Sequence, residues 1–197
     1  MIKVVDYKKL NEKIIVTPDM KQVVLEVPEG DVTKNLDVIL DTEGLEVEIL
    51  GVYVGTNNQK INLTVNAIHK APNTKCLTQV RGILKDSSFS SFKGLIKIEK
   101  KAQQTNSYLD DDVLILGEKA QNKSEPTLEI EADDVKATHG ATTGQISEDQ
   151  VFYLQSRGLS LDDAQGLIMK GFLDTVISRI SDDTIREKVT GKIWKIL

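Results

Sequence analysis

Cysteine is almost absent from this sequence: Cys76 is the only one in 197 residues. One thiol cannot form a disulfide within the chain, and it cannot build a zinc or iron–sulfur site from the cysteines of this chain alone. Aromatic residues are also scarce, at 5% of the chain, so a surface that stacks nucleic-acid bases is not expected. These absences exclude a disulfide scaffold and a cysteine-built metal domain.

Long apolar runs and an excess of basic residues are absent as well. No stretch approaches the roughly 20 apolar residues that span a bilayer, and the first residues lack the apolar core of a signal peptide. The formal net charge is −5, whereas nucleic-acid binders normally carry a basic excess. We therefore expect a cytoplasmic protein that binds neither membrane nor nucleic acid.

Sequence motifs of catalysis are also missing. There is no phosphate-binding loop of the GxxxxGK type, so ATP hydrolysis is not expected, and the serines of residues 87–91 lack a nucleophile elbow. The two histidines, His69 and His139, do not have the spacing of a zinc motif. The acidic triplet Asp110–Asp112 lacks the alternating ligands of a calcium loop and is interpreted as a polar turn or a site for adventitious cations. The chain is predicted not to be an enzyme.

Alternation of apolar and polar residues dominates residues 20–140 and predicts many short strands. Apolar residues of the later strands recur every 15 to 17 residues, at Ile83, Ile98, Ile115 and Ile130. A chain of this length with 40% hydrophobic residues can bury a sizeable core. Spacing alone is compatible with a sandwich, a barrel or a stacked solenoid. The apolar run VLIL indicates a strand covered on both faces, either in the core or at an interface.

The period changes after Ile146, and the pattern then predicts three helices. Ser147, Ser160 and Ser181 are the expected N-caps, and Gly158 is the expected stop of the first helix. Apolar residues recur every four positions in the second helix: Ala164, Ile168, Phe172, Val176 and Ile180. This stripe needs a cover, which is either the end of the strand-rich core or a partner protein.

Several separated motifs resemble one family. The stretch EIEADDVKATHGATTGQI, followed by QVFYLQSRGL and a later GF, is similar to the C-terminal core of the SufB/SufD proteins. The similarity extends back through FKGLIKIEKKAQQTNSYLDDDVLIL and covers roughly the second half of the chain, with the motifs in the family's order. These proteins are scaffold components of the SUF machinery for iron–sulfur cluster assembly, and the resemblance is closer to SufD.

The resemblance implies a fold and a division of the chain. It implies a mainly β protein, a right-handed parallel β-helix followed by a small C-terminal α-helical domain. The expected parts are an N-terminal segment (1–20), a β-helix core (21–145) and a C-terminal helical domain (146–197). The chain is much shorter than typical family members, and we therefore expect a shortened member.

The resemblance also implies partners. Family members dimerise through the β-helix, so we expect a homodimer or a dimer with a SufB-type partner. The expected interface residues are Val135, His139, Gly140 and Thr142. A SufC-type ABC ATPase is expected to dock on the helical tail. The expected contacts are Phe152, Tyr153, Arg157, Gly158, Gly171 and Phe172. For the aromatic residues the alternative is packing within the chain, and for Arg157 it is a bond to helix carbonyls.

His139 is the first candidate metal ligand, because neutral imidazole binds iron well. In SufD-like relatives the matching histidine lies at the interface with the partner scaffold and is implicated in cluster assembly. The alternative is a satisfied, partly buried histidine on the face of Val135 and Ala137. Cys76 is a second candidate ligand, and its alternative is a small buried core residue.

The sequence departs from the family at its thiolates. SufD-type relatives often have a cysteine where Ala137 stands. SufB proteins use a cysteine at or next to the position of Asp111 and a glutamate at that of Gly140. Because thiolates hold iron–sulfur clusters, the chain alone is not expected to keep a stable cluster. Iron or a cluster would be held transiently at a dimer interface.

Three functions follow in order of preference. The first is a non-catalytic scaffold subunit of a SUF-type assembly complex. The alternative is an iron-binding or cluster-delivery protein of the same fold without an ATPase partner. A more remote alternative is a polysaccharide-active β-helix enzyme, which would need catalytic carboxylates together in a groove, whereas the acidic residues here are scattered.

Overall fold

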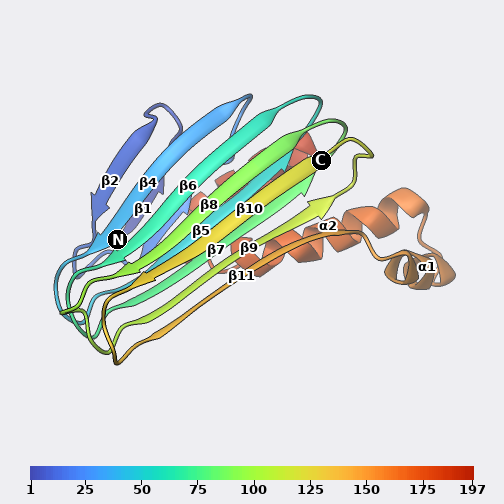
Figure 1. The fold of residues 1–197 in the computed structure, drawn as a ribbon. Helices are drawn as coiled ribbons and strands as arrows, with labels where there is room; N and C mark the ends of the chain where they lie inside the picture. The colour runs from blue at the N-terminus through green and yellow to red at the C-terminus, as the bar shows by residue number, and fades with distance from the viewer.

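The computed structural model describes residues 1–197 as a stack of β-strand coils followed by three helices (Figure 1). The strands are β1 (Ile2–Val5), β2 (Asn11–Ile15), β3 (Gln22–Leu25), β4 (Val32–Leu40), β5 (Glu46–Gly55), β6 (Lys60–His69), β7 (Lys75–Leu84), β8 (Phe89–Ile98), β9 (Asn106–Ile115), β10 (Gln121–Ile130) and β11 (Lys136–Gln145). The helices are α1 (Glu148–Ser156), α2 (Leu161–Ile177) and α3 (Asp183–Ile196).

Odd-numbered and even-numbered strands form two separate sheets. The order is β1-β3-β5-β7-β9-β11 in the six-stranded sheet and β10-β8-β6-β4-β2 in the five-stranded sheet, and every neighbouring pair is parallel. Glu46 pairs with Lys75, and Lys75 with Asn106, so one coil takes about 30 residues. The 15- to 17-residue repeat is therefore half a coil. The mainly β solenoid with C-terminal helices is confirmed.

Tight corners connect the strands. Asn57, Asn73 and Asp86 have φ of 54°, 57° and 55°, in the left-handed region that Asn and Asp tolerate better than other side chains do. Successive corners also bond to each other. The Ser87 N–H donates to the Asn57 carbonyl at 2.8 Å, and the Asn57 N–H donates to the Asp86 carboxylate at 2.7 Å. Corner residues therefore fix the stacking of one coil on the next.

Inward-facing side chains fill the space between the sheets with a core of 29 buried residues. Glycines at inward positions make room for large neighbours. A Cβ at Gly82 would lie 2.3 Å from Cζ of Tyr53, which sits one coil earlier in register. The Tyr53 hydroxyl donates to Ser90 Oγ at 3.1 Å. Tyr53 thus occupies space that only a glycine at position 82 leaves free.

Residues 1–20, the expected N-terminal segment, contain β1 and β2, which pair with β3 and β4. The Lys34 side chain is buried at this end, where it donates to the Glu12 carboxylate at 2.7 Å and to the Lys9 carbonyl at 3.1 Å. Tyr7 packs against the core. The first residues are therefore part of the solenoid. The strands end at Gln145.

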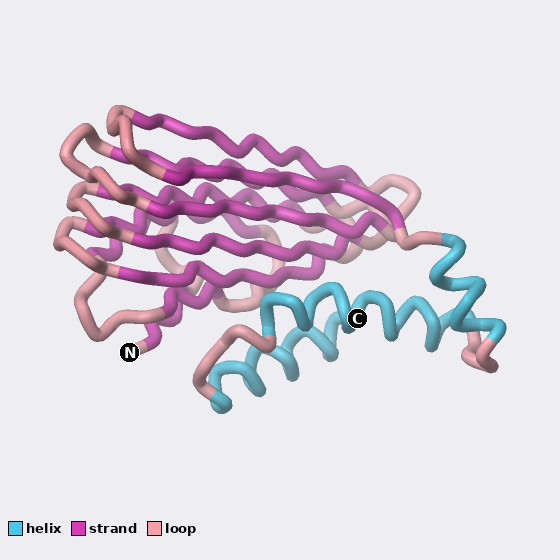
Figure 2. Tube along the Cα trace, turned by 90° about the horizontal axis from the view of Figure 1, so that it is seen from below, coloured by secondary structure: helices cyan, strands magenta, loops and turns pink.

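The helical tail folds back along the solenoid, and α2 and α3 lie against the outer face of the six-stranded sheet (Figure 2). A second core of 12 buried residues joins Val176 and Val189 of the helices to the sheet. The sheet contributes outward apolar residues to this core: Val24, Leu50 and Ile83. The end of the strand core is wrong as an expected cover for the stripe, because the side of the solenoid supplies the apolar face. A partner as the cover stays a prediction.

The third helix begins differently from the prediction. Its N-cap is Asp182, whose side chain accepts the Ile185 N–H at 2.9 Å. Ser181 instead donates its N–H and its hydroxyl to Gln22 Oε1, both at 3.0 Å, so it anchors the tail to β3. The other two predicted N-caps are confirmed: Ser147 and Ser160. None of the three helices has the length and apolar character needed to cross a membrane.

Candidate functional site at the open end and the helical tail

The C-terminal end of the solenoid is open. At this end β10 and β11 are the edge strands of the two sheets, and no further coil covers them (Figure 1). Side chains at their inward positions are half-buried or exposed, whereas those of β9 below are buried except for Ile115 at its end. His139 occupies an inward position of β11, in register with the buried Leu109 of β9. The predicted metal ligand therefore lies exposed at the open end.

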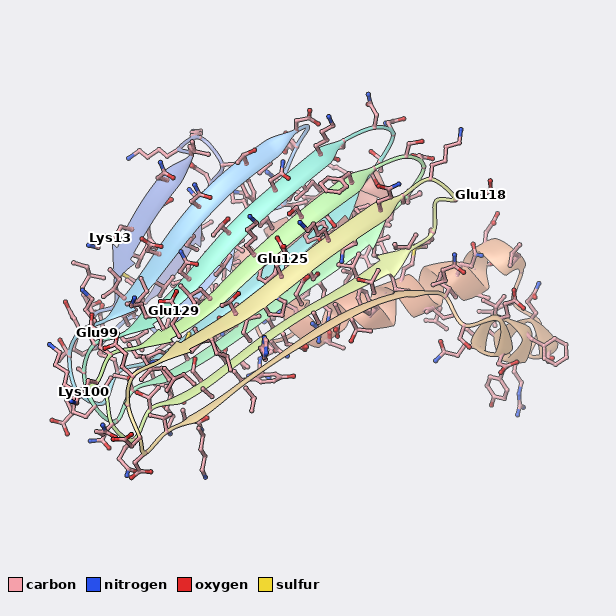
Figure 3. The ribbon with its side chains drawn as sticks, in the orientation of Figure 1. Lys13, Glu99, Lys100, Glu118, Glu125 and Glu129 are labelled. Carbon is pink, nitrogen blue, oxygen red and sulfur yellow. The ribbon has the colours of Figure 1, made fainter.

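The two strand edges at this end differ in chemistry. β10 has Pro126 in its middle. It also carries charged residues: Lys123, Glu125 and Glu129. Figure 3 shows Glu125 and Glu129 on this strand. Proline and charged side chains are features that keep edge strands from pairing with other chains. After Lys136, β11 has only small or neutral residues apart from His139. β11 therefore presents an unprotected edge.

The four residues predicted for a dimer interface lie on β11 or just before it. Val135 packs, partly buried, against the core. His139 is on the inward face, and Gly140 and Thr142 are on the outward face. A Cβ at Gly140 would lie 3.1 Å from the Asp110 carboxylate of β9. The structure brings the four residues to one edge of the sheet but distributes them over its two faces.

His139 and Cys76 are not brought together. Cys76 lies on β7, which β9 separates from β11, and only 3% of the residue is exposed. Burial raises the pKa of the Cys76 thiol to about 12, so the thiol stays protonated at neutral pH. No group of three His, Cys, Asp or Glu side chains could hold a metal ion. These surroundings favour the core alternative for Cys76, and His139 as a ligand stays a prediction.

The interpretation of Asp110–Asp112 as a polar turn is wrong, because all three residues lie within β9. Asp111 is in phase with Leu109 and Val113, and all three are buried inward. Asp110 and Asp112 face outward. The signal was present in the sequence, since the apolar residues on either side of Asp111 continue the period of two. Asp111 was nevertheless not assigned to the buried face, because charged residues are rarely buried in strands.

Asp111 is fully buried beneath the open end. Its Oδ2 accepts a hydrogen bond from the Ser124 hydroxyl of β10, and its Oδ1 has no partner. Burial raises the pKa of Asp111 to about 7, and the bond from Ser124 opposes that rise. Asn122 Nδ2 donates to Ser124 Oγ at 3.0 Å and to Thr143 Oγ1 at 2.8 Å. One polar network therefore joins β9, β10 and β11.

On the outer face, Arg81 of β7 connects the sheet to the tail, and the sequence pattern did not single it out. Its guanidinium binds Asp110 at 2.6 Å and Asp112 at 3.1 Å. The same group lies 5.9 Å from the ring centroid of Phe172 on α2, a cation–π arrangement. Phe172, predicted to contact the ATPase, therefore also holds α2 against the sheet.

α1 projects beyond the strand ends and has no buried residue (Figure 1). Phe152 is 72% exposed and Tyr153 is 58% exposed. The Arg157 guanidinium lies 5.3 Å from the Tyr153 ring centroid. Gly158 ends the helix with φ of +95°, as predicted. This helix therefore presents two aromatic side chains that are largely exposed to solvent.

A groove of about 490 Å³ runs between α2 and the last strands. Thr142 and Gly144 of β11 line one wall, and Gly171 and Phe172 of α2 line the other. A Cβ at Gly171 would meet nothing within 4 Å. A glycine inside a helix costs about 1 kcal/mol relative to alanine, and here nothing within the chain packs against it.

Comparison with known proteins agrees with this architecture. The model of the SUF system FeS cluster assembly, SufBD core domain, matches residues 11–172. The iron-sulfur cluster assembly protein SufD of Bacillus subtilis is 32% identical over 165 residues, which are 84% of this chain and 38% of that protein. SufD of Escherichia coli is 37% identical over 115 residues, 58% of this chain and 27% of that protein.

A third relative is the SufBD family protein slr0074 of Synechocystis, which is 30% identical over 133 residues, 68% of this chain and 28% of that protein. The chain thus spans less than two fifths of the length of each of these relatives. The family model covers most of the chain, including β2 to β11 and the start of the helical tail. The chain therefore belongs to the SufBD family of SUF-system iron–sulfur cluster assembly proteins and is closer to SufD.

Proposed function

We propose that the chain is a non-catalytic scaffold subunit of a SUF-type iron–sulfur cluster assembly complex. It dimerises through β11 at the open end of the solenoid and docks a SufC-type ABC ATPase on the helical tail. The single observation that carries this proposal is the unprotected edge of β11, which contrasts with the protected edge of β10 in the same coil. Family membership supplies the iron–sulfur context.

The β11 edge supports pairing with another strand. A free strand edge offers unpaired N–H and C=O groups to a second strand, and small side chains let that strand approach. Pairing of β11 with its counterpart in a second copy would bring both copies of His139, Gly140 and Thr142 to the contact. A SufB-type partner is the other occupant consistent with the same edge, and light scattering distinguishes the two.

A positive charge on this edge is expected to break the dimer. Thr138→Lys places an ammonium group on the exposed face of β11, where two copies of it would approach each other, and like charges in an interface cost several kcal/mol. The dimer dissociation constant should rise at least about tenfold. Size-exclusion chromatography with light scattering measures it.

Thr127→Lys is the matched control, because Thr127 is an exposed threonine on the β10 edge. It should leave the dimer intact. A monomeric wild type at every concentration, or equal weakening by both substitutions, would count against pairing through β11.

The exposed aromatic face of α1 and the groove beside α2 support docking of the ATPase. Phe152 and Tyr153 are large, apolar and uncovered, the composition that marks interaction surfaces. Gly171 leaves open space in the groove, which lets another polypeptide backbone approach α2 closely. Co-chromatography of the chain with the SufC-type ATPase from the same source tests this half of the proposal, and failure to bind would remove it.

Gly171→Ala is expected to change stability and ATPase binding in opposite directions. The substitution should raise the free energy of unfolding by about 1 kcal/mol, because alanine favours the helix and meets no atom. It should also weaken ATPase binding about tenfold, because the methyl group fills the approach. Gly191→Ala, in α3 with equally open space, should stabilise the chain without weakening binding. Denaturant titration and calorimetry measure the two effects, and unchanged binding of Gly171→Ala would place the contact elsewhere.

The cargo would be iron or a nascent cluster rather than a resident cofactor. The only thiol is buried, so the residues present do not fit a cluster held stably by one chain. His139 is the exposed ligand at the proposed dimer contact, and we infer that cargo passes there transiently. The alternative, an iron-binding or delivery protein without an ATPase partner, would be favoured by iron binding to a chain that fails to bind the ATPase.

A further inference from the structure

One carboxylate lies buried beneath the last coil. Asp111 is buried on β9 with Oδ1 unpartnered. Ala141 of β11 lies directly above it in register, and Ser124 of β10 bonds to it. Water can therefore reach the carboxylate only if β10 or β11 moves away. Within the chain both strands are edge strands, which have a neighbour on one side only, so they open more easily than the central strands of the solenoid.

We propose that Asp111 is a proton-operated latch for the last coil, which holds β10 and β11 closed while it keeps its proton and loosens them when the proton leaves. The neutral acid needs little solvation, whereas a carboxylate with an unpartnered oxygen in a buried site is strongly unfavourable. Opening of the coil relieves that cost by admitting water. This inference does not rest on dimerisation or on an ATPase.

The charged groups around Asp111 do not remove the cost. Asp110 and Asp112 flank it on β9 and oppose its ionisation, whereas Arg81 of β7 favours it. Arg81, however, is bound to those two aspartates on the other face of the sheet. Tyr53 is the ionisable neighbour of Asp111 from β5, and burial raises its pKa well above its usual range, so it stays neutral. The nearest inward titratable residue of β11 is His139, one inward position away from Ala141.

The direction of the pH effect follows from the binding of protons. In the closed coil the pKa of Asp111 is raised to about 7 from 3.8, so between these values the closed state holds a proton that the open state releases. Raising the pH through this window therefore favours opening, by up to tenfold per pH unit. Above pH 7 both states are ionised and the effect levels off. The latch therefore responds to pH changes just below pH 7.

Hydrogen exchange of the intact chain tests the latch. Protection factors of the β11 amides, corrected for intrinsic exchange rates, should fall at least about tenfold from pH 5 to pH 7 in the wild type. In Asp111→Asn, which has nearly the same shape and no charge, they should change less than about threefold. A fall of the same size in Asp111→Asn would overturn the proposal.

Two further variants keep the test sharp. Asp112→Asn removes one negative charge from the same strand on the outward side. Because that charge opposes ionisation of Asp111, the fall should remain but should end at a lower pH than in the wild type. Ser124→Ala removes the hydrogen bond that favours the ionised form, so the fall should continue to a higher pH than in the wild type. Equal loss of the effect in Asp111→Asn and Asp112→Asn, or no shift in Ser124→Ala, would contradict a latch at Asp111. Light scattering on each sample confirms that the oligomeric state is the same.

Discussion

Gly82→Ala is expected to lower the free energy of unfolding by about 3 kcal/mol, at the upper end of the usual cost of overpacking a core. The added methyl carbon would lie 2.3 Å from Cζ of Tyr53 and 2.5 Å from its hydroxyl oxygen. Tyr53 is only 1% exposed and is held by its hydrogen bond to Ser90, so the ring cannot turn out of the way. Denaturant unfolding followed by circular dichroism measures the change.

A double-mutant cycle identifies the cause. Tyr53→Ala alone removes a large buried side chain and should itself cost about 3 to 5 kcal/mol. Adding Gly82→Ala to it should cost almost nothing further, because the clash is gone. Gly144→Ala, on the exposed β11 strand with nothing within 4 Å, is the matched glycine control and should be nearly neutral. Additive costs in the cycle would show that the clash with Tyr53 is not the reason.

Acid is expected to destabilise the chain through His69. The residue is fully buried, with Nδ1 2.8 Å from Thr74 Oγ1 and Nε2 3.1 Å from Ser107 Oγ. Burial lowers the pKa of His69 from 6.5 to about 4. The folded chain therefore keeps the imidazole neutral where the unfolded chain protonates it. The stabilisation is complete above pH 6.5 and is lost as the pH falls to 4, by about 3 kcal/mol in all.

His69→Gln gives the comparison that isolates this contribution. Glutamine keeps hydrogen-bonding groups and does not titrate, so the variant should be less stable than the wild type at pH 7.5. The difference between the two should shrink as the pH falls through the window from 6.5 to 4. Asp111 acts in the opposite direction in part of this window, but it is common to both proteins and cancels. A constant difference across the pH range would refute the assignment to His69.

Most of the fold could be predicted from the sequence, because the spacing of apolar residues distinguishes the strands from the helices. Alternation with a period of two identified the strands, and the change after Ile146 identified the helices. The half-coil repeat did not exclude a sandwich or a barrel fold. The spacing determines the length of the strands but not which strands pair. The family resemblance resolved that choice. The side of the solenoid that α2 covers was not predicted, because the sequence pattern does not distinguish an outward apolar residue such as Leu50 from an inward one.

The site was only partly accessible. The motifs pointed to Phe152, Tyr153 and His139, which lie exposed in the structure, and their roles stay predictions. Asp111 and Arg81 were missed because their roles depend on neighbours one coil away. Asp111 is buried by β10 and β11, and Arg81 is held by β9 and Phe172. The prediction of Ser181 as an N-cap was wrong for the same reason, because Ser181 donates to Gln22, which is remote in sequence.

The tail that folds back on the outer face also changes how the stack comes apart. Coils that touch only their neighbours unzip one at a time from either end. Here α3 binds the second coil, where Lys188 pairs with Glu26 at 2.7 Å, and α2 packs on β5 and β7. The tail therefore acts as a splint across the early and middle coils, which should melt together in one cooperative transition. The last coil lies outside the splint and is free to fray without unravelling the rest.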